Sequence, residues 1–326
     1  MNMNIFRYLA TRRGKNSNLQ YYLKNFLSYA LPDFLFRRRL ATELAGLSDY
    51  DQEYINGRVN YYNKLDAVKS IAGNAVAVKN FRLRRKKFTP HGHFFDTYEH
   101  TRFFPTNNQI SLLFGDVTHI PAWPSIVKSR PIEGNNKNSI VLNLGKLRHF
   151  MFVKDKKPFQ DKKNRLVGRG AVYQPWRVKF WEMYFGHPLC DLGQVNKKPV
   201  LNKDWLVPRL TIYKHLEYKF ILSLEGNDVA SNLKWIMSSN SLAVMPRPTY
   251  ETWFMEGTLI PDYHYVEIKK DYSDLPEKLN YYLNNTGAAL KIIDNARRYA
   301  AQFQDKRRER LIALLVLKKY FENVEA

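Results

Sequence analysis

The sequence predicts an α/β protein with helical segments at both ends, and three features carry that prediction. Segments typical of strands and helices alternate through the second half of the chain, which favours a parallel sheet covered by helices. The 326 residues are 44% hydrophobic, which is enough for packed cores in about two domains. The stretches near both ends show helical periodicity and read as helical extensions.

The second half gives the clearest succession of elements. "RLVGRG" (165–170) reads as a strand ending in glycine, and Pro175 fits the first turn of the next helix. Then follow the strand "KFILSLEG", the helix "VASNLKWIMSSN", the strand "SLAVMP", the strand "YHYVEI" (263–268) and the helices "LPEKLNYYLNN" and "TGAALKIIDNARRYAAQF". This order predicts a parallel sheet with helices on both faces.

The first half is less regular. Ser48 is the expected N-cap of a helix over "DQEYINGRVNYYNKL", and residues 110–114 and 138–145 read as strands. The lysine-rich, proline-broken segment 153–164 is the expected connection between domains. We therefore expect domains at 1–153 and 154–303, followed by a basic amphipathic helix at 304–326. That helix would dock on the protein or lie on a bilayer.

The bulk charge indicates anionic partners. Lys and Arg number 52 against 30 Asp and Glu, a formal net charge of +22. Such a surface attracts nucleic acid, anionic lipid headgroups or phosphorylated glycolipid. No apolar run approaches the ~20 residues of a membrane span, and the amino-terminal stretch lacks the pattern of a signal peptide, so a cytoplasmic location is expected. The single cysteine, Cys190, excludes an internal disulfide.

Polar side chains follow the strand "KFILSLEG" at the start of the next helix. Gly226 would let the backbone approach a ligand closely, and the N–H groups of residues 229–232 carry the positive end of the helix dipole. Lys234 would add a full positive charge. The alternative is that Asn227 or Asp228 simply caps the helix. The pattern suits a phosphate but does not by itself require one.

A second loop repeats this arrangement one unit earlier in the chain. Arg169 and Gly170 end the strand "RLVGRG", and a guanidinium is suited to bidentate contacts with phosphate oxygens. The alternative is an ion pair between Arg169 and a surface carboxylate. Because the carboxyl ends of parallel strands meet at one edge of a sheet, the two loops should open together.

Further acidic and histidine side chains are candidates for chemistry. Asp116 follows the strand at 110–114 and is a candidate general base, with His119 beside it, or else an Asx turn. Glu251 and Glu256 would hydrogen-bond sugar hydroxyls or cap a helix. The motif "TPHGHFFDTYEH" has no recognised metal-ligand spacing, which favours structural roles for its side chains.

The segment from Tyr218 to Phe303 resembles the carboxyl-terminal signature of glycosyltransferase family 90, in "YKFILSLEGNDVASNLKW", "SSNSLAVM", "HYVEIKKDYSDLPEKLNYYLNN" and "IIDNARRYAAQF". Upstream, "NRLVGRGAVYQPWR" is similar to the Arg-Gly-Ser stretch of the family, and "FGDVTHIPAWP" to its segment with the catalytic aspartate. The resemblance extends over most of residues 109–303. It implies a GT-B-like fold, in which two Rossmann-like domains face across a cleft, the first on the acceptor side and the second holding the donor.

The resemblance also implies an inverting, metal-independent reaction with UDP-glucose or UDP-galactose, without a cofactor. Asp116 would be the general base, and His119, Glu251 and Glu256 would be sugar or acceptor contacts. The donor would be bound by Arg169, Gly170, Ala171, Gly226, Asn227, Asp228, Ala230, Ser231, Asn232 and Lys234.

Two positions depart from the family pattern. Asn232 stands where many members have an arginine two residues before the lysine, and Gly115 replaces the arginine before the catalytic aspartate. The features of the secretory branch are missing from the sequence, which points to the bacterial lipopolysaccharide branch.

The expected acceptor is therefore a phosphorylated lipid A–core sugar, and the expected location is peripheral, on an anionic inner membrane. Nucleic acid is not an expected partner. The alternatives are a basic nucleic-acid-binding protein and a peripheral membrane protein without catalysis.

Overall fold

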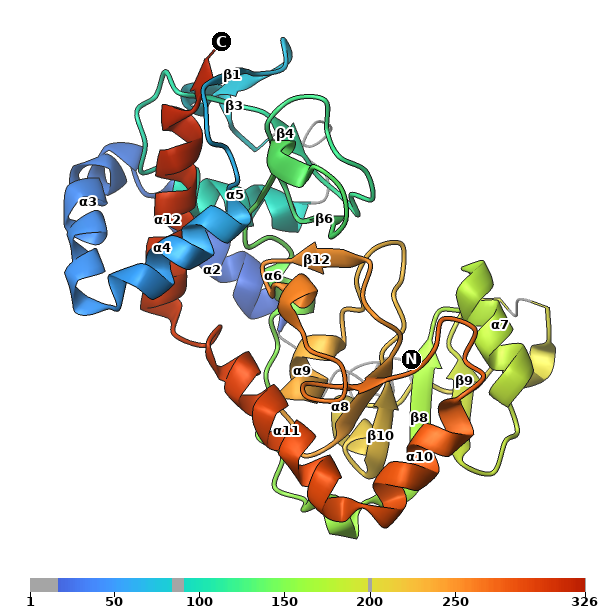
Figure 1. Cartoon of the computed structure of the whole chain (residues 1–326). Helices are drawn as coiled ribbons and strands as arrows, with labels where there is room; N and C mark the ends of the chain where they lie inside the picture. The colour runs from blue at the N-terminus through green and yellow to red at the C-terminus, as the bar shows by residue number, and fades with distance from the viewer. Residues whose placement is uncertain (1–16, 84–90, 199–200, 326) are drawn as a thin grey trace. The chain divides into compact units, whose positions relative to one another are not determined.

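The computed structural model describes residues 17–83, 91–198 and 201–325, which divide into two compact units (Figure 1). Unit 1 comprises Arg148–Pro248 and Thr258–Gln302. Unit 2 comprises Ser17–Leu147, Thr249–Gly257 and residues 303–325. The chain therefore first passes between the units after Leu147, a little before the expected connection. No pattern in the sequence predicted that residues 249–257 return to unit 2.

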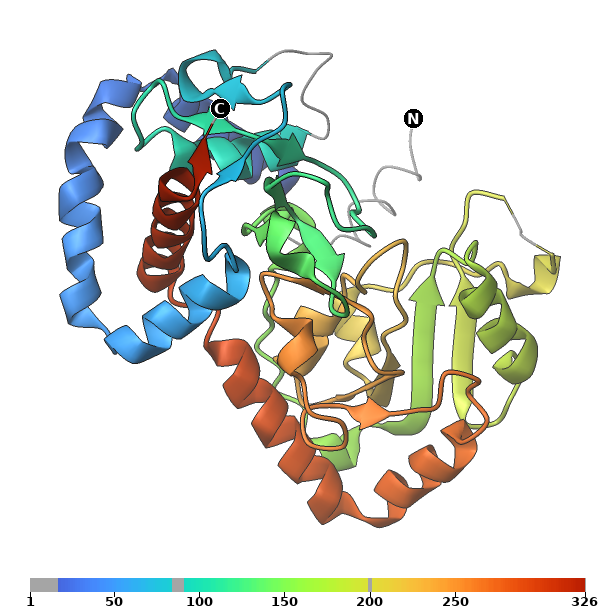
Figure 2. The same cartoon turned by 45° about the horizontal axis from the view of Figure 1, so that its top comes forward.

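Unit 1 is built on a five-stranded sheet in which every neighbouring pair is parallel. Its strands are β8 (Lys163–Gly170), β9 (Cys190–Gln194), β10 (Tyr218–Leu222), β11 (Leu242–Met245) and β13 (Val266–Glu267). They lie in the order β13-β11-β10-β8-β9, and Figure 2 shows β8 and β9 side by side and pointing the same way. The predicted parallel sheet is confirmed, and with it the α/β class.

The helices of unit 1 connect and follow these strands. They are α7 (Pro175–Tyr184), α8 (Ile212–His215), α9 (Leu233–Met237), α10 (Leu275–Asn284) and α11 (Thr286–Ala301), with short 3₁₀ turns at Phe159–Asp161 and Lys203–Trp205. Pro175 occupies the first turn of α7, as predicted. The core joins one face of the sheet to α7 and α10 through Phe180, Phe220, Val244 and Leu279, all nearly or fully buried.

Unit 2 combines helices with short strands. Its helices are α2 (Asn18–Ala30), α3 (Asp33–Ala45), α4 (Gln52–Tyr62), α5 (His91–Thr101) and α12 (Lys306–Glu322); α6 (Lys146–His149) and the 3₁₀ turn Glu256–Thr258 cross between the units. Further 3₁₀ turns lie at Gly46–Asp49, Val78–Asn80 and Asn136–Asn138.

The strands of unit 2 form small sheets. β4 (Leu112–Leu113), β5 (Ser125–Val127) and β7 (Ser139–Val141) make a three-stranded parallel sheet. The remaining strands pair as β1 (Lys69–Ser70) with β14 (Val324–Glu325), β2 (Val76–Ala77) with β3 (Gln109–Ile110), and β6 (Ser129–Pro131) with β12 (Tyr250–Thr252).

The carboxyl-terminal helix α12 is part of the core of unit 2. Ile312, Leu314 and Leu317 are completely buried, and the helix packs against α4 and α5. The Tyr320 hydroxyl accepts a hydrogen bond from the Ser111 N–H at 3.0 Å and donates one to the Pro124 carbonyl at 3.2 Å. Of the two alternatives that the sequence left for this helix, docking on protein is the one that the structure shows.

Three local predictions were wrong in detail. Asp51, not Ser48, caps α4: its carboxylate accepts the N–H groups of Glu53 and Tyr54, while Ser48 lies in the preceding 3₁₀ turn. The strand expected at residues 110–114 is divided at Ser111 between two different sheets. The helix expected from residue 229 begins only at Leu233 and is five residues long.

Candidate functional site

The order of the strands in unit 1 places the two predicted loops together. Taken in chain order, the strands lie as 2-1-3-4-5, with β8 first and β10 third. In such sheets the crossover direction reverses between the first and third strands, and ligands bind beyond the carboxyl ends of those two strands. The loops at that point follow β8 at Gly170 and β10 at Leu222. They are the loops that the sequence identified as suited to phosphate.

Arg177, in the first turn of α7, joins these two loops. Its guanidinium donates to the Ala171 carbonyl at 2.7 Å on one side, and to the carbonyls of Leu224 at 2.7 Å and Glu225 at 2.9 Å on the other. Burial lowers the pKa of Arg177, because a cation has been taken from water, and an anion bound nearby would offset that cost. The arginine therefore fixes the loops and brings positive charge to them.

Side chains add two further contacts between the loops. Gln174 donates an amide hydrogen bond to the Asn227 side-chain oxygen at 3.0 Å. The Trp176 indole N–H donates to the Glu225 carbonyl at 3.0 Å. Together with Arg177, these contacts hold the loops in one fixed arrangement before any ligand arrives, which reduces the entropy cost of binding.

The glycines of the two loops are not explained by the protein alone. A Cβ atom added at Gly226 would meet only the Arg177 guanidinium, at 3.6 Å, and the Val229 carbonyl, at 4.0 Å. At Gly170 the nearest atom is again the Arg177 guanidinium, at 3.6 Å. These are ordinary contact distances, and neither backbone has a positive φ. Glycine at these two positions leaves the backbone open to close approach by a ligand.

Arg169 is turned toward the neighbouring strand. It pairs with the Asp191 carboxylate at 2.5 Å and donates to the Asp191 carbonyl at 2.6 Å. Burial alone would raise the pKa of Asp191, but hydrogen bonds from Tyr218 and Arg169 bring it below its usual range. Of the two alternatives predicted for Arg169, a phosphate contact and an ion pair with a carboxylate, the structure shows the ion pair. A diphosphate would have to compete with Asp191 for the guanidinium, so its contact with the donor stays a prediction.

Asn232 and Lys234 are used by the fold around α9. The Asn232 side chain donates to the Leu222 carbonyl at 2.9 Å and accepts from the Ser223 hydroxyl at 3.2 Å, which ties the loop back to β10. Lys234 is completely buried. Because α9 has only five residues, the helix-dipole contribution expected from it is small. The other predicted donor residues lie in the same loop, with Asp228 and Ala230 buried and Ser231 partly exposed.

Asp116 lies in unit 2, just beyond the carboxyl end of β4. Gly115 before it has φ +117°, a conformation that favours glycine. The Asp116 side chain is 36% exposed and pairs with the ammonium of Lys128, which is buried after β5. The ammonium is the immediate charged neighbour of the carboxylate that was predicted to be the general base. His119 is exposed three residues further along, and Ser129 fixes the turn by accepting the Val117 N–H at 3.1 Å.

Glu251 and Glu256 are buried in unit 2 with partners of their own. The Glu251 carboxylate accepts from the Arg130 guanidinium at 2.7 Å and from the Tyr61 hydroxyl. Glu256 accepts the Thr252 N–H at 2.6 Å and the Thr252 hydroxyl at 2.9 Å. These contacts hold the 249–257 segment in place. Sugar contacts by either residue stay a prediction.

The histidine-rich motif forms α5 and serves packing. Asp96 accepts the Tyr21 hydroxyl at 2.7 Å and the Gly145 N–H at 2.8 Å, and Glu99 pairs with Lys146 at 2.7 Å. Within the described part of the chain, no three His, Cys, Asp or Glu side chains come together as metal ligands would. The side chain of His91 lies outside the described residues.

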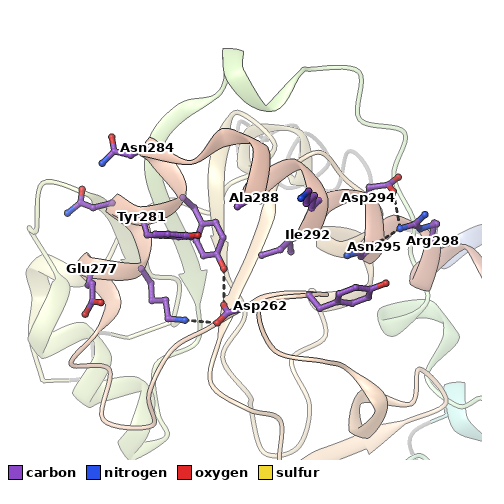
Figure 3. A pocket seen from close by; sticks show the side chains of 14 residues that line it. Asp262, Glu277, Tyr281, Asn284, Ala288, Ile292, Asp294, Asn295 and Arg298 are labelled. Atoms are coloured by element: carbon purple, nitrogen blue, oxygen red, sulfur yellow. Dashed lines mark hydrogen bonds and ion pairs between the residues drawn. The ribbon is translucent and has the colours of Figure 1, made fainter.

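A groove of about 930 Å³ lies elsewhere in unit 1, between α10, α11 and the loop that enters β13 (Figure 3). Asp262 sits at its centre, where it accepts hydrogen bonds from Lys278 at 2.6 Å and from the Tyr282 hydroxyl at 3.0 Å. None of the predicted site residues lines this groove. The loops at the switch point are therefore the candidate site, and the groove is a separate feature.

Arg177 is the residue that the sequence analysis did not assign to the site. It stands in the quoted stretch "QPWR", two residues after the helix-starting Pro175. Its position in the first turn of the helix that follows the first loop could have indicated this role, because a long side chain there can reach back over the loop. Its contact with the second loop, about fifty residues later in the chain, required the strand order.

A parallel sheet with two loops held together at its switch point is an arrangement in which α/β proteins commonly bind ligands. Residues 194–316 match the family model described as glycosyl transferase family 90. The chain is 40% identical over 310 residues to O-glucosyltransferase LpsA of Dichelobacter nodosus, covering 94% of this chain and 96% of that one. It is 31% identical over 170 residues to the human Protein O-glucosyltransferase 3, covering 50% of this chain and 32% of that one.

The chain belongs to glycosyltransferase family 90, and the resemblance seen in its sequence is confirmed. It is a glycosyltransferase. No helix within residues 17–83, 91–198 and 201–325 is both long and apolar enough to cross a membrane.

Proposed function

We propose that the protein transfers a hexose from a UDP-sugar to a core sugar of lipopolysaccharide or lipooligosaccharide. The observation that carries the proposal is the loop pair at the switch point of unit 1, joined by Arg177 and left open at Gly170 and Gly226. The name of the bacterial relative, O-glucosyltransferase LpsA, makes UDP-glucose the first donor to test and UDP-galactose the second.

In the proposed reaction Asp116 is the general base. An acceptor hydroxyl attacks the anomeric carbon while its proton passes to the Asp116 carboxylate. The new glycosidic C–O bond forms as the bond between the anomeric carbon and the diphosphate oxygen breaks. UDP leaves with that electron pair, and the anomeric centre is inverted. We propose a GT-B arrangement in which unit 2 presents Asp116 and the acceptor to the donor held by unit 1.

The charge of the leaving diphosphate would be met by protein groups in this proposal. Arg177 lies within hydrogen-bond distance of both loops, and the backbone N–H groups of the loops add partial positive charge. Arg169 would join them if the diphosphate displaced Asp191 from it. We propose that no metal ion or cofactor takes part, which a chelator tests directly.

The proposed acceptor is a phosphorylated lipid A–core, reached at the cytoplasmic face of an anionic inner membrane. The net charge of +22 supports this proposal, because both the acceptor and the membrane surface are anionic. Nucleic acid is the competing polyanion, and it would be bound through charge without the two loops.

Titration calorimetry with UDP tests the donor site. We expect micromolar binding that is unchanged by EDTA, and a loss of at least about tenfold in affinity for Gly226→Val, the size of a clash worth about 1.4 kcal/mol. The valine would occupy the room that the glycine leaves for a ligand. Gly287→Val is the matched control, because a Cβ at Gly287 meets nothing within 4 Å.

Three results would contradict the donor assignment. They are an absence of UDP binding, equal binding by wild type and Gly226→Val, and an equal loss of binding in both valine variants. Salt-sensitive binding of a short DNA duplex in the absence of UDP binding would favour the nucleic-acid alternative.

Transfer assays with Asp116→Asn test the base. We expect the rate of transfer to fall by about 10²–10⁴, the usual contribution of general base catalysis, while UDP affinity stays the same. Asp66→Asn is the control, because Asp66 also pairs with a lysine, Lys137, but both side chains are exposed. An Asp116→Asn enzyme with near wild-type turnover would exclude Asp116 as the base without affecting the donor site.

A further inference from the structure

The helices α2 and α3 of unit 2 expose a group of large apolar side chains. Of the twenty exposed large hydrophobic residues among the described part of the chain, seven fall between residues 19 and 35. We call these the α2–α3 stripe: Leu19, Leu23, Phe26, Leu27, Leu31, Phe34 and Leu35. Soluble proteins scatter single apolar side chains over their surfaces, whereas a cluster of this kind marks an interaction surface.

Helical geometry places the members of the stripe side by side. Leu19, Leu23, Phe26 and Leu27 recur at intervals of three and four residues along α2 and therefore share one face. The exposed fractions of Leu19 and Leu27 are 77% and 65%, so the face is open rather than half covered. Leu31 follows at the end of α2, and Phe34 and Leu35 are exposed in the first turn of α3.

One side of α2 packs on α5. Tyr29 packs edge-on against Phe94 with ring centroids 6.0 Å apart, and Tyr22 and Phe26 pack against Phe95 at 6.2 and 5.0 Å, so Phe26 lies at the border between the stripe and this contact. The Tyr21 hydroxyl donates to Asp96 on the same helix α5. Since these contacts fix the rotation of α2, the stripe cannot turn inward without breaking them.

Positive charge lies beside the stripe. Lys24 and Arg38 are exposed on the same two helices, and the Arg38 guanidinium lies 5.4 Å from the centre of the Phe34 ring. In the described residues 17–45, four Lys and Arg accompany two acidic residues. Both acidic residues are paired, Asp33 with Arg102 at 2.8 Å and Glu43 with Arg39 at 2.7 Å.

An apolar face with a basic rim matches the surface of a bilayer that contains anionic lipids. Nucleic acid would bind the charged side chains, but it offers no apolar surface that would cover the exposed leucine and phenylalanine side chains. A second copy would use the apolar residues but would bring together two chains that each carry a net charge of +22. An anionic membrane surface provides for both features.

We propose that the α2–α3 stripe is the membrane-binding surface of the protein, with α2 lying in the plane of an anionic bilayer. The 13 residues of α2 extend for about 20 Å at ~1.5 Å per residue, too short to span the apolar layer and suited to lying in the interface. The proposal builds on the proposed function in one respect, since a lipid-linked acceptor requires the enzyme at a membrane. The binding itself does not depend on catalysis.

Flotation with phospholipid vesicles tests the surface on the full-length protein. We expect it to float with vesicles of phosphatidylcholine and phosphatidylglycerol, and much less with phosphatidylcholine alone. Combined Leu23→Gln and Leu27→Gln should weaken binding at least about tenfold, because two apolar side chains that the apolar layer would bury are replaced by polar ones. Combined Lys24→Gln and Arg38→Gln should weaken it mainly at low salt.

Leu206→Gln with Leu290→Gln is the matched control, because these two leucines are exposed in unit 1. The proposal is overturned if the protein does not float, or if the control pair loses binding as the stripe pair does. It is also overturned if sedimentation shows a dimer that the stripe pair dissociates, which would assign the face to a second copy. UDP titration of every variant separates these outcomes from a failure of the donor site, because a folded variant with an intact unit 1 still binds UDP.

Discussion

At the scale of single residues, the buried ionisable groups of α5 show how the sequence motif is used. His100 is buried beside Lys146, whose ammonium lies 3.3 Å from the His100 Nε2 atom. A neutral imidazole can accept a hydrogen bond there, whereas a protonated one would place two cations in contact. Burial, and next the charge of Lys146, lower the pKa of His100 to about 3. The histidine is therefore a neutral core residue.

This environment predicts a loss of stability in acid. Between pH 6.5 and about 3 the unfolded chain binds a proton at His100 that the folded chain does not bind. Stability is therefore complete above pH 6.5 and falls as the pH drops through this window. In the His100→Gln variant we expect the free energy of unfolding to decrease less steeply with falling pH, by up to about 1.4 kcal/mol per pH unit, the value for one proton. Urea unfolding at several pH values measures this difference.

His119→Gln is the control for this prediction, because His119 is exposed. Burial raises the pKa of the neighbouring Asp96 to about 6, which acts in the opposite direction but equally in wild type and variant. Parallel pH profiles for wild type and His100→Gln would show that His100 does not titrate differently on folding.

The two arginines of the candidate site show what the sequence could predict at this scale. The loop after "RLVGRG" was identified from its position behind a strand, and the structure confirms that position. The direction of each guanidinium was not predictable. Arg169 is drawn to Asp191, which lies on the next strand, while Arg177 reaches a loop that follows a different strand. Both choices depend on contacts that form only when the sheet is assembled.

At the scale of elements, residues 249–257 are the part of the fold least visible in the sequence. They leave the parallel sheet after β11, pair with β6 through β12 in unit 2, and then return. The Trp253 ring stacks on Tyr62 with centroids 3.9 Å apart, and its indole N–H donates to Glu309 at 2.5 Å. The local sequence pattern does not indicate that residues 249–257 leave unit 1, because their partners lie on α4, β6 and α12.

We expect the buried ion pair between Arg130 and Glu251 to contribute most to holding residues 249–257 in unit 2. Both side chains are almost completely inaccessible, and Arg130 also donates to the Tyr61 carbonyl at 2.7 Å. Arg130→Met leaves the Glu251 carboxylate buried without its cation, which costs about 3–5 kcal/mol. We expect a loss of this size in the free energy of unfolding measured with guanidinium chloride.

Arg247→Met provides the comparison. Arg247 pairs with Glu267 at 3.3 Å, but its side chain is 69% exposed. Exposed pairs contribute at most about 1 kcal/mol, so this variant should unfold nearly as wild type does. If the two variants were equally stable, the pair at Arg130 would not be what holds the segment.

At the scale of the whole molecule, the two units differ in how well the sequence predicted them. Four of the five strands of unit 1 overlap their predicted segments, because each of these carries its own apolar run between turn or helix signals. The fifth, β9 (Cys190–Gln194), was not predicted, because its sequence CDLGQ has no such run. Unit 2 is held together by distant pairings, such as β1 with β14 and Arg58 with Glu309 at 2.5 Å. Pairings between opposite ends of a chain leave no local signal, and so the pairing of β1 with β14 was not foreseen. In the three-stranded sheet, β4 and β7 lie within the predicted segments 110–114 and 138–145, whereas β5 was not predicted.

This division predicts where a donor nucleotide acts. If UDP binds the loops after β8 and β10, a concentration 100-fold above its dissociation constant stabilises the folded state of unit 1 by about 2.7 kcal/mol. Hydrogen exchange should then slow at the amides of β8, β10 and β11, by up to about 100-fold where exchange requires unit 1 to open. Amides of α4 and α12 in unit 2 serve as the internal reference. Protection confined to unit 2 would be incompatible with a donor site at the switch point. Protection that begins in unit 1 and extends to residues around Asp116 only when a UDP-sugar replaces UDP would mean that the intact donor also orders the catalytic loop.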